Sequence, residues 1–252
     1  MNPAILSVLF LALSCDLVES IFPYSFYQSA LMSLDLRLLT YDKRIRPGLE
    51  TEDFPPAVTV NVTAFVLKLF DYNNERNSIR MSFFYREQWV DGRLTFDGND
   101  TDIKQIVLKQ DTLDKIWTPD TFFTNSFDNT IHHNQPNPTT FLKMSSEGEV
   151  FYSKKLTTDV GCHPLKVKHQ LPIVCSFEIE SYGTSTKDIV YKWKRVNGTF
   201  SDAVGIESVA VTALKDKDRL KYVSHKLEEK ETQLNSGNYS RLVLSITLDE
   251  DK

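Results

Sequence analysis

The chain has 252 residues, of which 41% are hydrophobic and 25% are charged. This hydrophobic content is enough to form a packed core, and it excludes a globally disordered chain. The formal net charge of -5 argues against a nucleic-acid-binding protein, which normally presents a basic face. The length suits one large β domain or two small domains.

The N-terminal segment resembles a secretory signal. Residues 4–13 form an apolar run that is too short to span a bilayer, although no Lys or Arg precedes it. Cleavage would follow Ser14 or Ser20. We therefore expect residues 1–20 to be a signal peptide, with a buried N-terminal helix as the alternative. No later stretch is apolar over the length of a membrane-spanning helix.

Secretion limits how the three cysteines pair. Cys15 leaves with the signal if cleavage follows Ser20, and twelve residues separate the remaining Cys162 and Cys175. In an oxidising compartment these two form one disulfide, whereas two separate buried thiols are the alternative. Four Asn-x-Ser/Thr sequons are predicted glycosylation sites: Asn61, Asn99, Asn197 and Asn238.

The first predicted element of the mature chain is a short helix. In "SALMSLDLRLL", residues 29–39, Leu31, Leu34 and Leu38 recur at helical spacing. Pro47 and Gly48 end this helix at the latest.

Alternation of apolar and polar residues dominates from there, which is typical of half-buried strands. One predicted strand buries Val58, Val60, Val62, Ala64 and Val66. The next buries Ile79, Met81, Phe83 and Tyr85 and turns Ser82, Phe84, Arg86 and Gln88 to the other face. Further strands are predicted in residues 148–158, 187–196 and 238–248. This pattern predicts an all-β, immunoglobulin-like sandwich of about ten strands with one short N-terminal α-helix, as a single domain over residues 21–252.

Signatures of enzymes are missing from the sequence. It has no GxSxG, no P-loop and no GxGxxG after a strand. The adjacent pair His132 and His133 would point in opposite directions on a strand, which makes a poor metal site. We therefore expect neither catalysis, nor a metal, nor a cofactor.

Two predicted strand faces have an unusual composition. Phe84 and Arg86 lie two residues apart on the polar side of one strand, and Phe151, Ser153 and Lys155 repeat the arrangement on another. A ring beside a cation and a hydroxyl suits the docking of a small charged molecule. A solvated sheet face with an exposed Phe is the alternative.

Six ordered motifs together resemble one family over residues 28–248. They are "YDKRIRPG", "YREQWVDGRL", "IWTPDTFF", "GEVFYSKKLT", "FEIESYGTSTKDIVYKW" and "NSGNYSRL", with the cysteine ring between the fourth and the fifth. The chain is similar to the extracellular ligand-binding domain of Cys-loop, or pentameric ligand-gated, ion channels. The similarity is greatest to the anion-selective branch of GABA, glycine and glutamate-gated chloride receptors.

The resemblance implies a pentamer, homomeric or heteromeric, with a small amine or amino-acid ligand between neighbouring subunits. It implies one side of the site from aromatic and polar residues of three segments: Phe122, Glu180, Tyr182, Tyr239 and Arg241. It implies the other side from strand residues of the neighbour: Phe84, Arg86, Ser153, Lys155 and Lys68. Aromatic faces and Glu180 would hold an ammonium, and Arg86 with Ser153 would hold a carboxylate. The implied location is extracellular, with a membrane reached only through a transmembrane domain outside this sequence.

Some positions depart from the family pattern. The ring tip reads Leu171-Pro172-Ile173-Val174 and lacks the usual acid, and Leu234 and Thr184 replace common aromatics. Near its C-terminal end the sequence has Asp249, Glu250 and Asp251 where receptors tend to have basic residues before the membrane. Three alternatives follow: the extracellular part of a receptor, a secreted relative of the acetylcholine-binding-protein type, and a structural β-sandwich without a small ligand.

Overall fold

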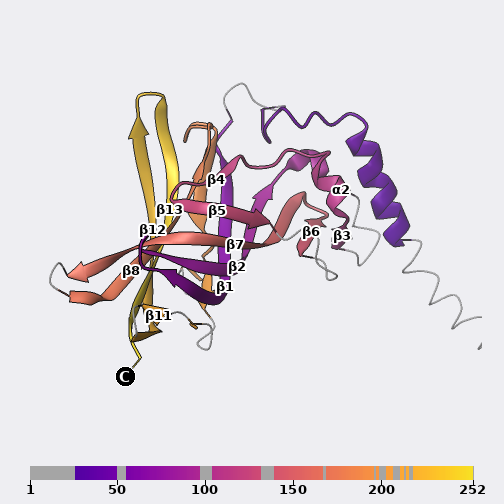
Figure 1. Cartoon of the computed structure of the whole chain (residues 1–252). Helices are drawn as coiled ribbons and strands as arrows, with labels where there is room; N and C mark the ends of the chain where they lie inside the picture. Colours follow the sequence, from indigo (N-terminus) through magenta and orange to yellow (C-terminus); the bar gives the residue numbers. More distant parts are fainter. Residues whose placement is uncertain are drawn as a thin grey trace, which may run out of the picture.

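The computed structural model describes residues 26–49, 55–96, 104–131, 139–166, 169–195, 197–198, 203–206, 211–212, 214–215 and 218–251. The predicted signal peptide and the sequon at Asn99 lie outside these residues. The described part is mostly β-strand with a helix near its N-terminus, so the predicted fold class is confirmed (Figure 1). Its named elements are β1 (Val58–Asn73), β2 (Ser78–Val90), η1 (Gly92–Leu94), β3 (Gln105–Leu108), α2 (Gln110–Leu113), β4 (Thr121–Phe123), β5 (Ser126–Ile131), β6 (Thr140–Ser145), β7 (Glu149–Lys166), β8 (His169–Ser181), β9 (Ile189–Trp193), β10 (Val204–Ile206), β11 (Leu214–Lys215), β12 (Asp218–Leu234) and β13 (Gly237–Glu250).

The N-terminal helix covers residues 26–38 and packs through one face, as its apolar spacing predicts. Ala30 and Leu34 are buried, and Leu31 and Leu38 pack against the core from its edge. The other face is polar apart from exposed apolar residues such as Met32. The helix therefore contributes to the core through an apolar stripe, in which every third or fourth residue is apolar and faces inward.

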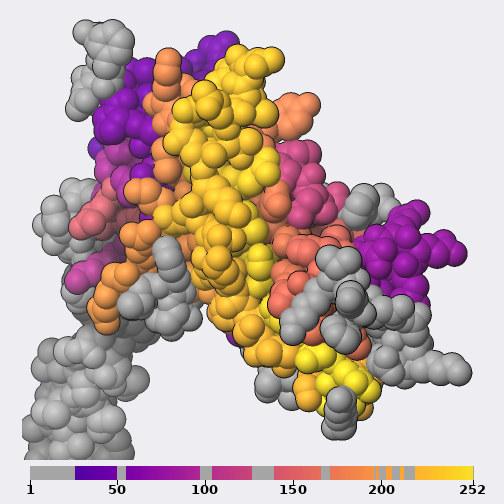
Figure 2. Space-filling view, turned by 90° about the vertical axis from the view of Figure 1, so that its left-hand side faces the viewer, coloured from indigo at the N-terminus to yellow at the C-terminus, as the bar shows by residue number. Residues whose placement is uncertain are grey.

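The strands form one hydrogen-bonded path in the order β10-β1-β2-β7-β8-β13-β12-β11. The path folds into two layers. Contacts between aromatic rings of β2 and rings on β8 and β4 show that the layers face each other. Phe83 contacts Phe177 on β8 at 5.0 Å, and Tyr85 contacts Phe123 on β4 at 5.3 Å, both edge to face. We call β1, β2 and β7 with their neighbours the first sheet, and β4, β8, β13 and β12 the second sheet. Figure 2 shows the β12–β13 hairpin as a ridge across one face of the molecule.

Strand alternation decides which side chains enter the core. All five apolar residues predicted for β1 and all four predicted for β2 are buried. These residues are Val58, Val60, Val62, Ala64, Val66, Ile79, Met81, Phe83 and Tyr85. The side chains between them face away from the second sheet, because successive residues of a strand point to opposite faces.

Two charged residues also lie between the sheets. Glu87 is 3% exposed and accepts hydrogen bonds from the hydroxyls of Tyr85 and Thr121. The ammonium of Lys154 lies 5.3 Å from the ring centre of Tyr85 and 5.6 Å from that of Tyr152. Hydroxyl donors and π faces thus stabilise charges that are costly to bury alone.

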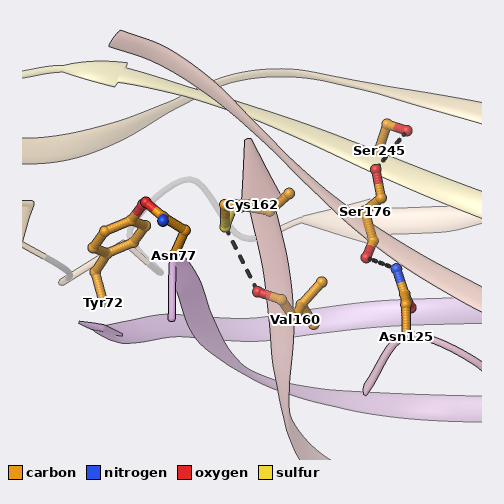
Figure 3. The surroundings of a disulfide bond; sticks show 8 residues. Tyr72, Asn77, Asn125, Val160, Cys162, Ser176 and Ser245 are labelled. Atoms are coloured by element: carbon orange, nitrogen blue, oxygen red, sulfur yellow. Dashed lines mark hydrogen bonds between the residues drawn. A yellow bond between two sulfur atoms is a disulfide. The ribbon is translucent and has the colours of Figure 1, made fainter. Parts of the chain in front are cut away.

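The predicted disulfide between Cys162 and Cys175 is confirmed, with an S–S distance of 1.99 Å. The two residues pair directly where β7 leaves the first sheet and joins β8, so the ring is a β-hairpin. Figure 3 shows Cys162 beside Asn77, and the backbone N–H of Cys162 donates to Asn77 O at 2.6 Å. The disulfide therefore fixes the place where β7 passes from one sheet to the other, next to the β1–β2 turn. This hairpin lies at the end of the molecule away from the N-terminal helix (Figure 1).

Candidate functional site

The outer face of the second sheet presents the first group of predicted site residues. Cross-strand register aligns Phe122 on β4, Glu180 on β8 and Arg241 on β13 in one row. Direct cross-strand neighbours share a face, and Phe122 alternates with the buried Phe123, so this row points away from the core. Phe122 is 41% exposed and Tyr182 is 77% exposed, and their rings meet edge to face at 5.4 Å. The two rings form a surface that a cation can approach.

Asp120 fixes the loop that holds Tyr182. Its carboxylate accepts from Ser181 Oγ at 2.7 Å, from Gly183 N at 2.9 Å, and from Thr184 N and Oγ1 at 3.1 and 3.0 Å. Its backbone carbonyl accepts from Tyr182 N at 3.0 Å. One carboxylate ahead of β4 thus shapes the turn after β8. Asp120 was not among the residues predicted from the sequence, although a carboxylate directly before a short strand in "TPDTFF" was a usable signal.

Glu180 has a cation partner within the chain. It is 7% exposed, and Arg241 Nε donates to its Oε2 at 2.7 Å. Arg241 Nη1 also donates to Glu178 Oε2 at 2.9 Å, and Thr124 Oγ1 donates to the same oxygen at 3.0 Å. One guanidinium therefore neutralises part of the charge of two half-buried or buried carboxylates. An incoming ammonium would share Glu180 with Arg241.

Tyr239 lies near the tip of the β12–β13 hairpin. It is 7% exposed, and its hydroxyl donates to Ser236 Oγ at 3.0 Å. The neighbouring Asn238 O accepts from Thr186 N at 2.8 Å, which ties the hairpin to the loop that holds Tyr182. Leu234, at the end of β12, is 52% exposed. A backbone hydrogen bond therefore joins the hairpin tip to the Tyr182 loop, in addition to the pairing of β13 with β8.

The outer face of the first sheet presents the second group. Register places Arg86 opposite Ser153, and Phe84 opposite Lys155. The guanidinium carbon of Arg86 lies 5.9 Å from the ring centre of Phe84. Lys68 lies on the same face, beyond a β-bulge of β1 and opposite Ser82, with its ammonium 4.9 Å from the ring centre of Phe70. The sheet thus gathers these predicted residues onto one face, with Lys68 at its margin.

Arg86 differs from the other arginines of the described residues that are not exposed. The other three, Arg46, Arg93 and Arg241, each form an ion pair with a carboxylate of the chain. The guanidinium of Arg86 makes no hydrogen bond and no ion pair to any residue that the structure describes. It lines a hollow of about 440 Å³ together with Thr63, Phe65 and other residues of β1, β2, β7 and β10. A half-buried guanidinium without a counter-charge favours an anionic group from outside the chain.

The two groups lie on opposite outer faces of the sandwich. Phe84 and Arg86 alternate with Phe83 and Tyr85, whose rings face the second sheet. Phe122 alternates with Phe123, whose ring faces the first sheet. The core therefore separates the two groups within one chain, and only a neighbouring chain can bring them together.

The described sequons differ in their surroundings. Asn197 and Asn238 are exposed, and Asn197 adopts a φ of 51° in a turn. Asn61 is half-buried in β1 between β2 and β9, and its side chain lines the hollow beside Arg86. A glycan on Asn61 and a ligand in that hollow exclude each other. Glycosylation at all four sequons, Asn99 included, stays a prediction.

Neither metal ligation nor membrane crossing is indicated in the part of the chain that the structure describes. Its His, Cys, Asp and Glu side chains form no group of three or more that fits a metal ion. None of its helices combines the length and the apolar character that crossing a bilayer requires.

Comparison with known proteins identifies the family. Residues 31–249 match the family model described as "Neurotransmitter-gated ion-channel ligand binding domain". The chain is 32% identical over 158 residues to a glutamate-gated chloride channel of Drosophila melanogaster, which covers 61% of this chain and 33% of that protein. It is 33% identical over 166 residues to a gamma-aminobutyric acid receptor alpha-like protein of Drosophila melanogaster, covering 64% of this chain and 23% of that protein. It is equally similar to the gamma-aminobutyric acid receptor subunit alpha-6 of Gallus gallus, with 33% of that subunit covered.

The chain thus spans about a third or less of the length of these relatives. The matched family comprises receptor domains and not enzymes, and the relatives belong to the anion-selective branch that the motifs indicate. The chain belongs to the neurotransmitter-gated ion-channel ligand-binding domains, because the family model matches nearly all of its described residues.

Proposed function

We propose that this domain is extracellular and binds a small amine or amino-acid ligand between neighbouring subunits of a pentamer. Tyr182, Phe122 and Tyr239 of one subunit hold the ligand's ammonium, and Arg86 and Ser153 of the next hold its carboxylate. In a full receptor, this binding opens an ion pore formed by segments outside this sequence. The relatives named above, channels and receptors gated by glutamate or gamma-aminobutyric acid, support the assignment.

The observation that carries the proposal is the guanidinium of Arg86. It has no counter-charge among the described residues, it lines a hollow, and a ring and a hydroxyl lie beside it. Its planar donors suit a carboxylate with two parallel hydrogen bonds. The exposed pair of rings on the opposite face provides the complementary surface for a cation.

The position of the two groups also supports a site shared between chains. A ring-shaped oligomer joins one face of each subunit to a different face of the next. Two half-sites on opposite faces of the sandwich are what such a head-to-tail contact requires. Glu180 then serves both the ligand and Arg241, so ligand binding would weaken the ion pair within the chain.

A subunit-mixing experiment tests the shared site. We expect Arg86→Gln and Tyr182→Ala each to weaken binding of the best amino acid found by calorimetry, by about tenfold or more for the arginine. Each variant keeps one face intact. Equal mixing of the two variants before assembly therefore restores about a quarter of the interfaces, as half multiplied by half.

The matched control mixes Arg86→Gln with the double variant, which restores no intact interface. Equal binding in both mixtures, or an assembly that stays monomeric at high concentration, would count against a site between subunits. Binding that survives both single substitutions would favour the structural β-sandwich without a small ligand.

A further inference from the structure

The hollow beside Arg86 extends to a second cation. Lys194 follows β9 and is half-buried, and its backbone N–H donates to Val62 O at 2.9 Å, which holds it against β1. Its ammonium donates to Gln88 Oε1 at 2.6 Å and makes no ion pair with any described carboxylate. An ammonium has three donors, so two remain for other acceptors. Lys194 and Arg86 line the same hollow.

The strand register places Gln88, the hydrogen-bond partner of Lys194, beside Arg86. Arg86 and Gln88 point to the same face of β2 two residues apart, which separates them by about 7 Å. On β1, Thr63 lies opposite Arg86, and Asn61 lies opposite Gln88. Each cation therefore has a neutral polar side chain beside it that is free to complete the hydrogen bonding of an acidic group.

Both carboxylates near the hollow already accept hydrogen bonds within the chain. Glu149 accepts a hydrogen bond from Gln88 Nε2. It does not line this hollow, but it lines two neighbouring ones, one of which also includes Asn61, Gln88 and Lys194. That bond orients the Gln88 amide so that its carbonyl faces Lys194. Glu87 also lines the hollow, but its carboxylate lies on the core side, where it accepts hydrogen bonds from Tyr85 and Thr121. Two half-buried cations thus share one hollow of about 440 Å³.

We propose that Lys194, Gln88 and Asn61 form a second anion subsite, so that this hollow prefers a ligand with two acidic groups. One acidic group binds Arg86, and the other accepts the free donors of Lys194 and the amide of Asn61. The inference rests on the proposed function only in assigning the first acidic group to Arg86. Both cations belong to one chain, so the preference does not depend on assembly.

The test compares dicarboxylic acids with monocarboxylic acids of equal length. Calorimetric titrations at low salt use succinate, glutarate and adipate, each matched with butyrate, valerate or hexanoate. We expect the wild-type chain to bind at least one dicarboxylate about tenfold more tightly than its partner. Lys194→Gln keeps a donor for Gln88 but removes the charge, so we expect it to abolish this preference and leave monocarboxylate affinity unchanged.

Lys221→Gln is the matched control, because Lys221 is an exposed lysine on β12 of the second sheet. It should change neither series. No preference in the wild-type chain, or an equal effect of Lys194→Gln on both series, would overturn the second subsite.

The proposed function fails separately from this inference. If Arg86→Gln leaves both series unchanged while Lys194→Gln still weakens the dicarboxylates, the second subsite stands and the role of Arg86 is wrong. Mass spectrometry of the protein secreted from animal cells gives an independent outcome. A glycan on Asn61 would occupy the subsite and overturn it, whereas an unmodified Asn61 supports it.

Discussion

Replacing Asp120 should loosen the loop that presents Tyr182. In Asp120→Ala, four hydrogen bonds to a carboxylate disappear, two of them from the backbone N–H groups of Gly183 and Thr184. A hydrogen bond contributes about 1 kcal/mol net, more when its acceptor is charged. Water compensates part of this loss, because Gly183 is exposed and Thr184 N also donates to Ser181 Oγ. We expect the free energy of unfolding to fall by about 3 kcal/mol.

Two measurements check this expectation. Urea unfolding should show a lower midpoint with an unchanged slope, since the same surface is exposed on unfolding. Amide hydrogen exchange should speed up at Gly183 and Thr184 before it changes in the core strands. Asp120→Asn keeps an acceptor and loses the charge, so its effect should lie between those of wild type and Asp120→Ala.

Asp111→Ala is the matched control, because Asp111 is an exposed carboxylate in α2. It should leave both measurements unchanged. Unaltered exchange at Gly183 and Thr184 in Asp120→Ala would refute the role given to this carboxylate, because both N–H groups donate to it in the wild type.

Two further predictions concern stability. Burial, followed by the charges of Glu87 and Asp114, raises the pKa of Tyr152 from 10.0 to about 12. The unfolded chain therefore loses this proton at lower pH than the folded chain, and the free energy of unfolding falls as pH rises from about 10 to about 12. Melting curves of Tyr152→Phe should show a smaller loss of stability over that pH range. A loss equal to that of the wild type would contradict the assignment. Replacing Cys162 and Cys175 together by Ser should lower the free energy of unfolding by about 3 kcal/mol, because the disulfide restricts the unfolded chain. A melting temperature equal to that of the wild type would show instead that other contacts stabilise the hairpin.

Local chemistry made the strands and the ring predictable. Alternation placed Phe83 and Tyr85 inward and Phe84 and Arg86 outward, because a strand turns successive side chains to opposite faces. The same period in "IVYKWK" puts Lys194 on the face opposite to Trp193, so the outward direction of Lys194 was also predictable from the sequence.

The partners of the charged side chains were not predictable in this way. Arg241 reaches Glu180 across 61 residues, and Lys194 reaches Gln88 across 106 residues. Nothing in the sequence pattern distinguished Lys154, yet its ammonium lies among core rings. Each of these contacts depends on which strands are neighbours and in which register they pair.

The sequence by itself determined the N-terminal helix, five of the strands, the inward and outward faces of β1 and β2, the family and the disulfide. Only the tertiary structure decided that Arg241 forms an ion pair with Glu180, that Arg86 has no counter-charge among the described residues, and that the two groups of predicted site residues lie on opposite faces. The physical reason is that face alternation is a property of one strand, whereas pairing of charges is a property of the register between strands distant in sequence.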